Sequence, residues 1–157
     1  ELFLSNPIVI KNNNIIITTE KSVLSYNTLT ALKNWNLSAR AIFKPIVTSN
    51  YTYAILKNDL LICLDNTNGN VVWSKNIFKN SKNIKKLDKF SSIVDFKIVN
   101  SEINIFSKNG YLLSFNLNNG NLNYLNRISK NGISSEIVFL NNNMLFFDSD
   151  NRLLKFN

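Results

Sequence analysis

The sequence contains no histidine and only one cysteine, Cys63. Without histidine the chain lacks the commonest general base and metal ligand, and a Ser-His-Asp triad cannot form. A single cysteine supplies neither a zinc site of the Cys/His type nor an intramolecular disulfide. Cysteine usage therefore does not decide between the cytoplasm and an extracytoplasmic space.

Glycine is scarce as well, with four residues, and nothing in the chain matches a glycine-rich phosphate loop or a nucleotide-binding fingerprint. No apolar run is long enough to span a membrane, and no signal peptide begins the chain. Because the chain starts at Glu1 rather than Met, we expect a processed form with a signal or a lipid anchor upstream.

Acidic residues are few, since 10 Asp and Glu face 18 Lys and Arg, for a net charge of +8. Asp148 and Asp150 lie two apart at a hairpin, which is too weak a pattern to predict calcium. Arginine is limited to Arg40, Arg127 and Arg152, and no recognised module appears, so we do not expect nucleic-acid binding. We predict no catalytic residue, no cofactor and no metal, and hence no enzyme.

The chain contains one sequence pattern that is repeated three times. Each copy is an apolar strand, an Asp/Asn-rich turn and a second strand that carries an aromatic residue, and a fourth copy begins at residues 153–157. The copies belong to units of about forty residues, a size that fits four short strands. The three complete copies cover residues 23–35, 61–73 and 112–124.

The strands within each unit are rich in β-branched and aromatic residues, and helix signals are nearly absent. Asn109-Gly110 predicts a type I′ hairpin turn between the second and third strands, because both residues tolerate a positive φ. Asn58-Asp59 and Asp150-Asn151 occupy the matching places, and we expect a looser turn at Glu20-Lys21.

These units predict an all-β fold, a β-propeller of four-stranded antiparallel blades. A β-sandwich is the alternative, but it needs no similar turn every forty residues. We expect one propeller domain or partial propeller over residues 1–157, with residues 1–5 as a candidate closing strand for the incomplete last unit. The predicted repeats are 7–38, 45–77, 93–128 and 136–157.

The strongest copy resembles the repeat of the pyrroloquinoline-quinone (PQQ)-like propellers. In that family the third strand runs into an Asp, a Thr-x-Gly turn and an outer strand bearing Trp. The corresponding residues are Asp65, Thr67, Gly69 and Trp73 in the strong copy, Asn116, Gly120 and Tyr124 in a degraded copy, and Asn27 and Trp35 in a further one that has lost its glycine. We expect the glycines to close the turns and the three aromatic residues to pack between adjacent blades.

The resemblance implies two branches of function. One contains quinone-dependent dehydrogenases, which hold quinone and calcium on the propeller axis. The other contains non-catalytic scaffolds such as BamB-type lipoproteins of the bacterial outer-membrane β-barrel assembly machinery. The chain shows neither an adjacent cysteine pair nor a Glu/Asn/Asp cluster for calcium, so we expect a periplasmic or outer-membrane-associated scaffold that binds protein partners. The alternatives are a fragment of a PQQ-dependent dehydrogenase or ligand sensor, and an intracellular interaction propeller of the WD type.

One segment departs from the repeat, residues 79–90, and it holds five lysines. Propellers carry partner-specific chemistry on such connections, so a contact with an acidic protein surface or anionic lipid headgroups is one interpretation, and a solvated loop is the other. The candidate partner-binding residues are Lys79, Lys82, Lys85, Lys86, Lys89 and Phe90. PQQ-like propellers usually have seven or eight blades, so the four units predict either half of a larger propeller or a small ring that assembles further, for example as a homodimer.

Overall fold

The computed structural model describes residues 6–78, 93–141 and 143–156. The chain divides into two compact units, Glu1–Lys79 and Asn80–Asn157, and the described part of each contains two antiparallel sheets. The four sheets are called blades 1 to 4 in chain order. No helix occurs among the described residues.

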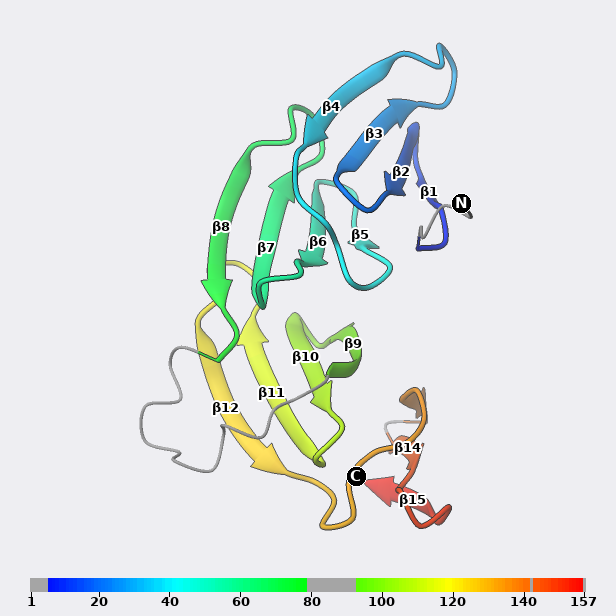
Figure 1. Ribbon diagram of the computed structural model, residues 1–157, viewed down its shortest axis with the longest axis vertical. Coiled ribbons are helices and arrows are strands. Elements are labelled where there is room, and N and C mark those ends of the chain that lie inside the picture. The colour runs from blue at the N-terminus through cyan, green and yellow to red at the C-terminus, as the bar shows by residue number, and fades with distance from the viewer. Residues whose placement is uncertain (1–5, 79–92, 142, 157) are drawn as a thin grey trace. The chain divides into compact units, whose positions relative to one another are not determined.

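Unit 1 consists of two four-stranded sheets in which neighbours in sequence are neighbours in space (Figure 1). Both are antiparallel meanders, so each strand continues into the next through a short connection. Blade 1 contains β1 (Val9–Lys11), β2 (Asn14–Thr18), β3 (Val23–Asn27) and β4 (Lys33–Leu37), and blade 2 contains β5 (Ile46–Val47), β6 (Tyr51–Ile55), β7 (Leu60–Asp65) and β8 (Val71–Asn76).

Unit 2 repeats the same meander in one four-stranded and one three-stranded sheet. Blade 3 contains β9 (Ile93–Val99), β10 (Glu102–Ser107), β11 (Tyr111–Asn116) and β12 (Leu122–Arg127), and blade 4 contains β13 (Val138–Leu140), β14 (Asn143–Phe147) and β15 (Leu153–Phe156). Residues 1–5, for which the sequence predicts a closing strand, and the whole segment 79–90, for which it predicts a basic contact, lie outside the described residues.

The register of the third and fourth strands shifts at one recurring position. The irregularity follows Ser25 in blade 1, Cys63 in blade 2 and Ser114 in blade 3. A bulge there raises the local twist and directs the chain into the turn that follows. The common bulge therefore fixes which residues of the three blades are structurally equivalent.

The hairpins between second and third strands differ from the prediction in turn type. Only the last residue of each turn has a positive φ, at Asp59 (59°), Gly110 (84°) and Asn151 (59°). In each case its N–H donates to the carbonyl three residues earlier, as in a type I turn followed by a left-handed residue. The type I′ prediction is wrong, because one left-handed residue after a type I turn gives these strands the twist that they need.

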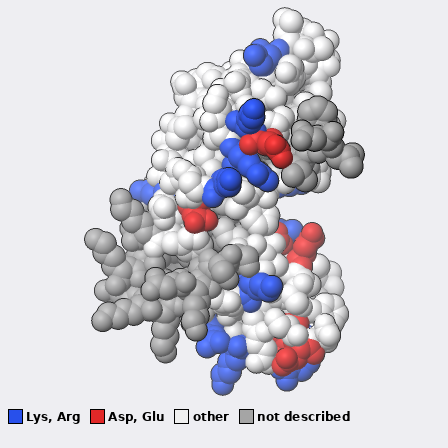
Figure 2. Space-filling view, in the orientation of Figure 1, with Lys and Arg blue, Asp and Glu red and all other residues white. Residues whose placement is uncertain are grey.

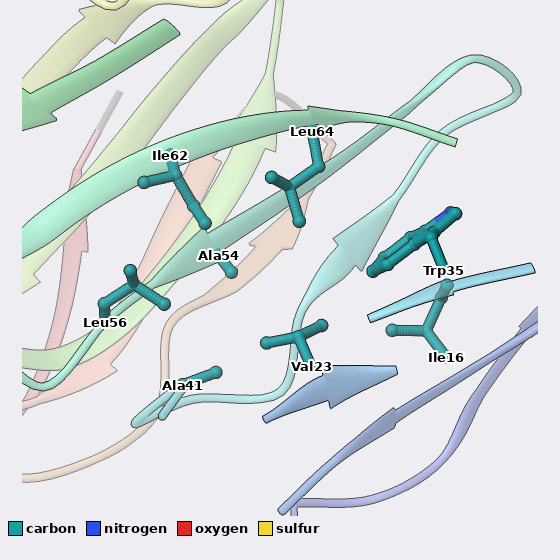
Figure 3. Close-up of a cluster of buried hydrophobic side chains, with 8 residues drawn as sticks. All are labelled: Ile16, Val23, Trp35, Ala41, Ala54, Leu56, Ile62 and Leu64. Atoms are coloured by element: carbon teal, nitrogen blue, oxygen red, sulfur yellow. The ribbon is translucent and has the colours of Figure 1, made fainter. Parts of the chain in front are cut away.

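Each unit has its own hydrophobic core between its two sheets. In unit 1 the core joins Ile16, Val23 and Trp35 of blade 1 to residues of blade 2 across the gap (Figure 3). The blade 2 side consists of Ala54, Leu56, Ile62 and Leu64, with Ala41 from the connection. Alternate residues of each strand face this core, as expected for half-buried strands.

In unit 2 the core gathers Phe106 and Ile128 from blade 3 with Met144 and Phe146 from blade 4. A buried carboxylate adds a polar link between these blades, because Asp95 on β9 accepts a hydrogen bond from the backbone N–H of Ile137 (3.0 Å). This hydrogen bond joins residues 42 apart in the chain, and Ile137 directly precedes β13 of blade 4.

Candidate functional site

The predicted repeat motif forms the same turn in blades 2 and 3. Asp65 Oδ1 accepts hydrogen bonds from the N–H (2.7 Å) and the hydroxyl of Thr67, and Gly69 N–H donates to the Asp65 carbonyl (2.8 Å). Asn116 accepts in the same way from the amide two residues on (2.9 Å), and Gly120 N–H donates to its carbonyl (2.9 Å). The hydroxyl and the N–H of Thr67 hold the pKa of Asp65 below its usual range.

Blade 1 makes the turn without glycine. Asn27 Oδ1 accepts from the N–H of Leu29 (2.8 Å), and Ala31 N–H donates to the Asn27 carbonyl (3.0 Å). Ala31 therefore adopts φ 56°, where the other two blades have glycine at φ 74° and 67°. An alanine in this left-handed region is strained, because its Cβ crowds the following carbonyl.

Trp35 of blade 1 packs on the motif turn of blade 2. Its indole Nε1–H donates to the carbonyl of Asn66 (2.9 Å), and the side chain is almost fully buried. The ring lies so close to Gly69 that a Cβ built there would be 2.6 Å from Trp35 Cγ. Gly69 thus has two roles, since it provides the left-handed backbone and leaves room for the ring of the neighbouring blade.

The other two aromatic residues of the motif lie in different surroundings. Trp73 is half-buried beside Tyr53 of its own sheet, with ring centroids 6.0 Å apart. Tyr124 is 38% exposed, and its hydroxyl donates to Glu102 (3.3 Å) within the same sheet. Among the described residues, only Trp35 of the three is seen to pack on the motif turn of the next blade.

The predicted basic contact cannot be located, because its residues Lys79, Lys82, Lys85, Lys86, Lys89 and Phe90 lie outside the described residues. On the face drawn in Figure 2, the described Lys and Arg side chains lie at several separate places, some of them beside acidic side chains. Asp148 and Asp150 also pair with a cation of the chain, since Arg152 contacts Asp148 (3.1 Å) and Asp150 (2.6 Å).

Two hollows open beside the strands. One, of about 520 Å³ in unit 1, is lined mainly by amide and hydroxyl side chains, among them Asn14, Asn34 and Asn50. The other, a groove of about 350 Å³ in unit 2, combines polar and apolar walls between blades 3 and 4. Its lining includes Glu102, Asn104, Tyr124, Phe139, Met144 and Phe156.

The polar wall of the groove offers hydrogen-bond acceptors. Glu102 accepts from Ser114 (2.8 Å) and Asn123 (2.8 Å) as well as from Tyr124, which fixes its carboxylate on the surface of blade 3. Asn104 is 6% exposed, and its Oδ1 is buried with no hydrogen-bond partner in the described part of the chain. A buried acceptor without a partner costs free energy, so a donor brought by a ligand would be stabilised there.

The groove also lies beside a strand edge that no described strand covers. Phe156 of β15 lines the groove, and β15 pairs with β14 on one side only. No described strand pairs with its other edge, where backbone N–H and C=O groups can pair with an added strand. Acceptors, aromatic walls and a strand edge together can hold an extended peptide segment.

The sequence-based prediction did not find this groove. Glu102 and Tyr124 are 22 residues apart and meet only through the register of β10, β11 and β12. The feature of the sequence that could have indicated the groove is Asn104, a polar residue between Ile103 and Ile105 in β10. Within the described residues no group of three or more His, Cys, Asp or Glu could hold a metal ion, and no helix has the length and apolar character to cross a membrane.

Comparison with known proteins identifies the repeat. A family model described as outer membrane protein assembly factor BamB matches residues 1–157. No curated protein matches the chain in sequence.

Solved structures match in fold. BamB from Moraxella catarrhalis superposes with a TM-score of 0.73 at 9% identity, over 96% of this chain and 43% of that one. The computationally designed protein Ika4 has a TM-score of 0.72 at 9% identity, over 99% and 92% of the two chains. Quinohemoprotein alcohol dehydrogenase from Comamonas testosteroni has a TM-score of 0.58 at 12% identity, over 76% and 20%. The fold is part of an all-β propeller, as predicted, and the chain spans less than half the length of the BamB structure.

Proposed function

Because this chain belongs to the PQQ-like propeller family of the outer membrane protein assembly factor BamB, we propose that it is a non-enzymatic scaffold in outer-membrane β-barrel protein assembly. It would act in the bacterial periplasm or at the outer membrane, by binding protein components of the assembly machinery. Family membership supports protein binding in general, and the groove in unit 2 supplies a place for it.

The single observation that carries the proposal is the groove beside the edge of β15 that no described strand covers. An extended segment that pairs with β15 would satisfy backbone groups along the edge, and its side chains would contact Phe139 and Phe156. Donors from that segment would reach Glu102 and the buried Oδ1 of Asn104. The groove therefore suits a partner strand that carries apolar side chains and free N–H or amide donors.

The lysine-rich segment 79–90 remains a second proposed contact of the same scaffold. Its positive charge would attract an acidic partner surface or anionic lipid headgroups at the outer membrane. It would raise the association rate more than the final affinity, because exposed charges act chiefly by steering.

The test is binding of the purified chain to the purified barrel-forming subunit of the assembly machinery from the same bacterium. We expect saturable binding, and we expect Tyr124→Ala to weaken it by at least about tenfold because an aromatic wall of the groove is lost. Tyr51→Ala is the matched control, since Tyr51 is 37% exposed in unit 1 and Tyr124 is 38% exposed. Glu102→Gln should also weaken binding, and Glu136→Gln, at an exposed carboxylate outside the groove lining, should not.

Absence of binding to the assembly subunit would contradict the proposed function. Equal losses for Tyr124→Ala and Tyr51→Ala would place the contact elsewhere on the chain. Saturable binding of quinone with calcium, followed by calorimetry, would instead favour the dehydrogenase branch of the fold.

A further inference from the structure

The hollow in unit 1 is a polar pocket between blades 1 and 2, and we call it the amide pocket. Its volume is about 520 Å³, within the range of about 300–1,000 Å³ that is typical of small-molecule sites. Blade 1 contributes Asn14, Asn27 and Asn34, and blade 2 contributes residues at its β5–β6 and β7–β8 turns. All of its described walls therefore belong to one compact unit.

Asn66 fixes the blade 2 side of the amide pocket. Its side chain is 5% exposed, and its Oδ1 accepts from the hydroxyl of Thr52 (2.6 Å). Its Nδ2 donates to the carbonyls of Thr48 (3.0 Å) and Ser49 (3.3 Å), and its backbone N–H donates to the carbonyl of Asn50 (2.9 Å). These hydrogen bonds join the β5–β6 turn to the β7–β8 turn. This wall is thus formed before a ligand arrives, which lowers the ordering cost of binding.

The other amide side chains have polar atoms that no described residue engages. Asn34 Nδ2 donates to Asn14 Oδ1 (2.9 Å), which leaves Asn14 Nδ2 and Asn34 Oδ1 available. Asn27 and Asp65 each use Oδ1 to hold their own turn, which leaves Asn27 Nδ2 and Asp65 Oδ2 available. The described part of the amide pocket therefore offers both donors and acceptors to a ligand.

This lining selects the chemical class of the ligand. No Lys, Arg or aliphatic residue is among the described residues that line the pocket, so an anion or an aliphatic ligand would find no matching wall there. A hydroxyl group both donates and accepts, so a ligand with many hydroxyls matches the mixed set of polar atoms.

Tyr51 adds an aromatic wall to the amide pocket. The residue is 37% exposed, and its ring makes a T-shaped contact with Tyr53, with ring centroids 6.4 Å apart. That contact holds the ring in place. An exposed aromatic ring among polar groups suits the C–H face of a sugar, because such a ring has an apolar body and a polar tip.

We propose that the amide pocket binds a neutral saccharide, whose hydroxyls bond to Asn27, Asn34 and Asp65 while one ring face packs on Tyr51. This site lies in unit 1 and does not depend on the groove in unit 2 or on the scaffold role. A chain with both sites would bind a polysaccharide surface and a protein partner through different blades.

The experiment titrates the 157-residue chain with three neutral trisaccharides, chitotriose, cellotriose and maltotriose, by calorimetry and NMR. At concentrations up to about 10 mM, where even a ligand with a Kd of about 1 mM is close to saturation, we expect saturable binding of at least one of them. The indole N–H of Trp35 donates to the carbonyl of Asn66 (2.9 Å), a residue that lines the pocket. Its NMR signal should therefore shift on binding.

Two exchanges that already occur among the repeats change the available atoms and keep the turns. Asn27→Asp keeps the Oδ1 acceptor and removes the Nδ2 donor, and Asp65→Asn keeps Oδ1 and removes the Oδ2 acceptor. Each should weaken binding about three- to tenfold, because one hydrogen bond to the ligand is lost. Asn116→Asp is the matched control, since Asn116 holds the same turn in blade 3 and should not affect binding. Thermal unfolding checks that the three variants remain folded.

Tyr51→Ala and Tyr124→Ala separate this proposal from the proposed function. Tyr51→Ala should weaken saccharide binding and leave binding of the assembly subunit unchanged, and Tyr124→Ala should do the reverse. Either proposal can therefore fail while the other holds.

Absence of binding for all three trisaccharides would overturn the saccharide proposal. Binding that Asn27→Asp and Asp65→Asn leave unchanged, or that Asn116→Asp weakens equally, would overturn it as well. The capped peptide acetyl-Gly-Gly-Gly-amide offers amide donors and acceptors without hydroxyls. If this peptide shifts the Trp35 signal and the trisaccharides do not, the amide pocket binds peptide and the proposal is wrong.

Discussion

Replacement of Gly69 by alanine tests the central packing feature of unit 1. Gly69 has φ 74°, and an added Cβ would lie 2.6 Å from Cγ and 2.7 Å from Cδ2 of Trp35. Real Cβ contacts are never this short, so the indole ring of Trp35 or the turn must move. Movement of the ring would also disturb the hydrogen bond from Trp35 Nε1 to the Asn66 carbonyl (2.9 Å).

The expected cost has two parts. A left-handed backbone costs alanine about 1–2 kcal/mol relative to glycine. Overpacking against a buried ring adds about 1–3 kcal/mol. We expect Gly69→Ala to lower the free energy of unfolding by about 2–5 kcal/mol, a large fraction of the about 5–15 kcal/mol typical of a domain.

Urea unfolding followed by tryptophan fluorescence and circular dichroism measures this cost. Two companion variants separate its parts. In a Trp35→Leu background the contact with the indole is absent, so Gly69→Ala should cost only about 1–2 kcal/mol there. Ala31→Gly, at the equivalent exposed position of blade 1, should stabilise the protein by about 1–2 kcal/mol, because it relieves the strain at φ 56°.

The reasoning fails if Gly69→Ala costs the same with and without Trp35, because the ring would then not be the obstacle. It also fails if Ala31→Gly destabilises the protein, because the left-handed turn would then carry no strain.

Two further predictions concern titratable side chains. The Arg152 backbone N–H, then the Asp150 backbone N–H and the Arg152 side chain, hold the pKa of Asp148 below its usual range. Its ionised form therefore stabilises the fold above the pKa of the unfolded chain, and this contribution is lost as pH falls through the folded pKa. Thermal unfolding measured from neutral pH to about pH 3 should show that Asp148→Asn is less stable than wild type at neutral pH and that this difference in stability disappears in acid. A stability difference that does not depend on pH would contradict this. Burial raises the pKa of the Cys63 thiol to about 11, so this thiol should resist a thiol reagent at pH 8 and react once urea unfolds the protein. Rapid labelling of the folded protein would contradict this and show that β7 is open to solvent.

Much of the fold follows from local patterns in the sequence. The alternation of apolar residues, the recurring turn at Asp65 and Asn116 and the period of the units predict antiparallel blades, because each of these features is set within one hairpin. The prediction of a type I′ turn at Asn109-Gly110 was wrong, because residue preference alone does not distinguish this turn from a type I turn followed by one left-handed residue.

The groove and the exposure of repeated positions depend on facts that local patterns do not contain. Glu102 and Tyr124 meet through the pairing of three strands, and Asn104 becomes an unpaired acceptor only once its neighbours are in place. Leu153 and Leu61 occupy equivalent places in the repeat, yet one is 61% exposed and the other is fully buried. Exposure depends on the neighbouring blade, which no hairpin specifies.

The hydrogen bond from the Ile137 N–H to Asp95 bears on how such repeats are inherited. Repeats are generally gained and lost as single units, because each contacts only its neighbours. Here Asp95 of blade 3 accepts the hydrogen bond of the buried Ile137 N–H, just before blade 4 begins (3.0 Å). Deletion of blade 3 alone would leave that N–H without its acceptor, so blades 3 and 4 should be duplicated, exchanged or lost as a pair.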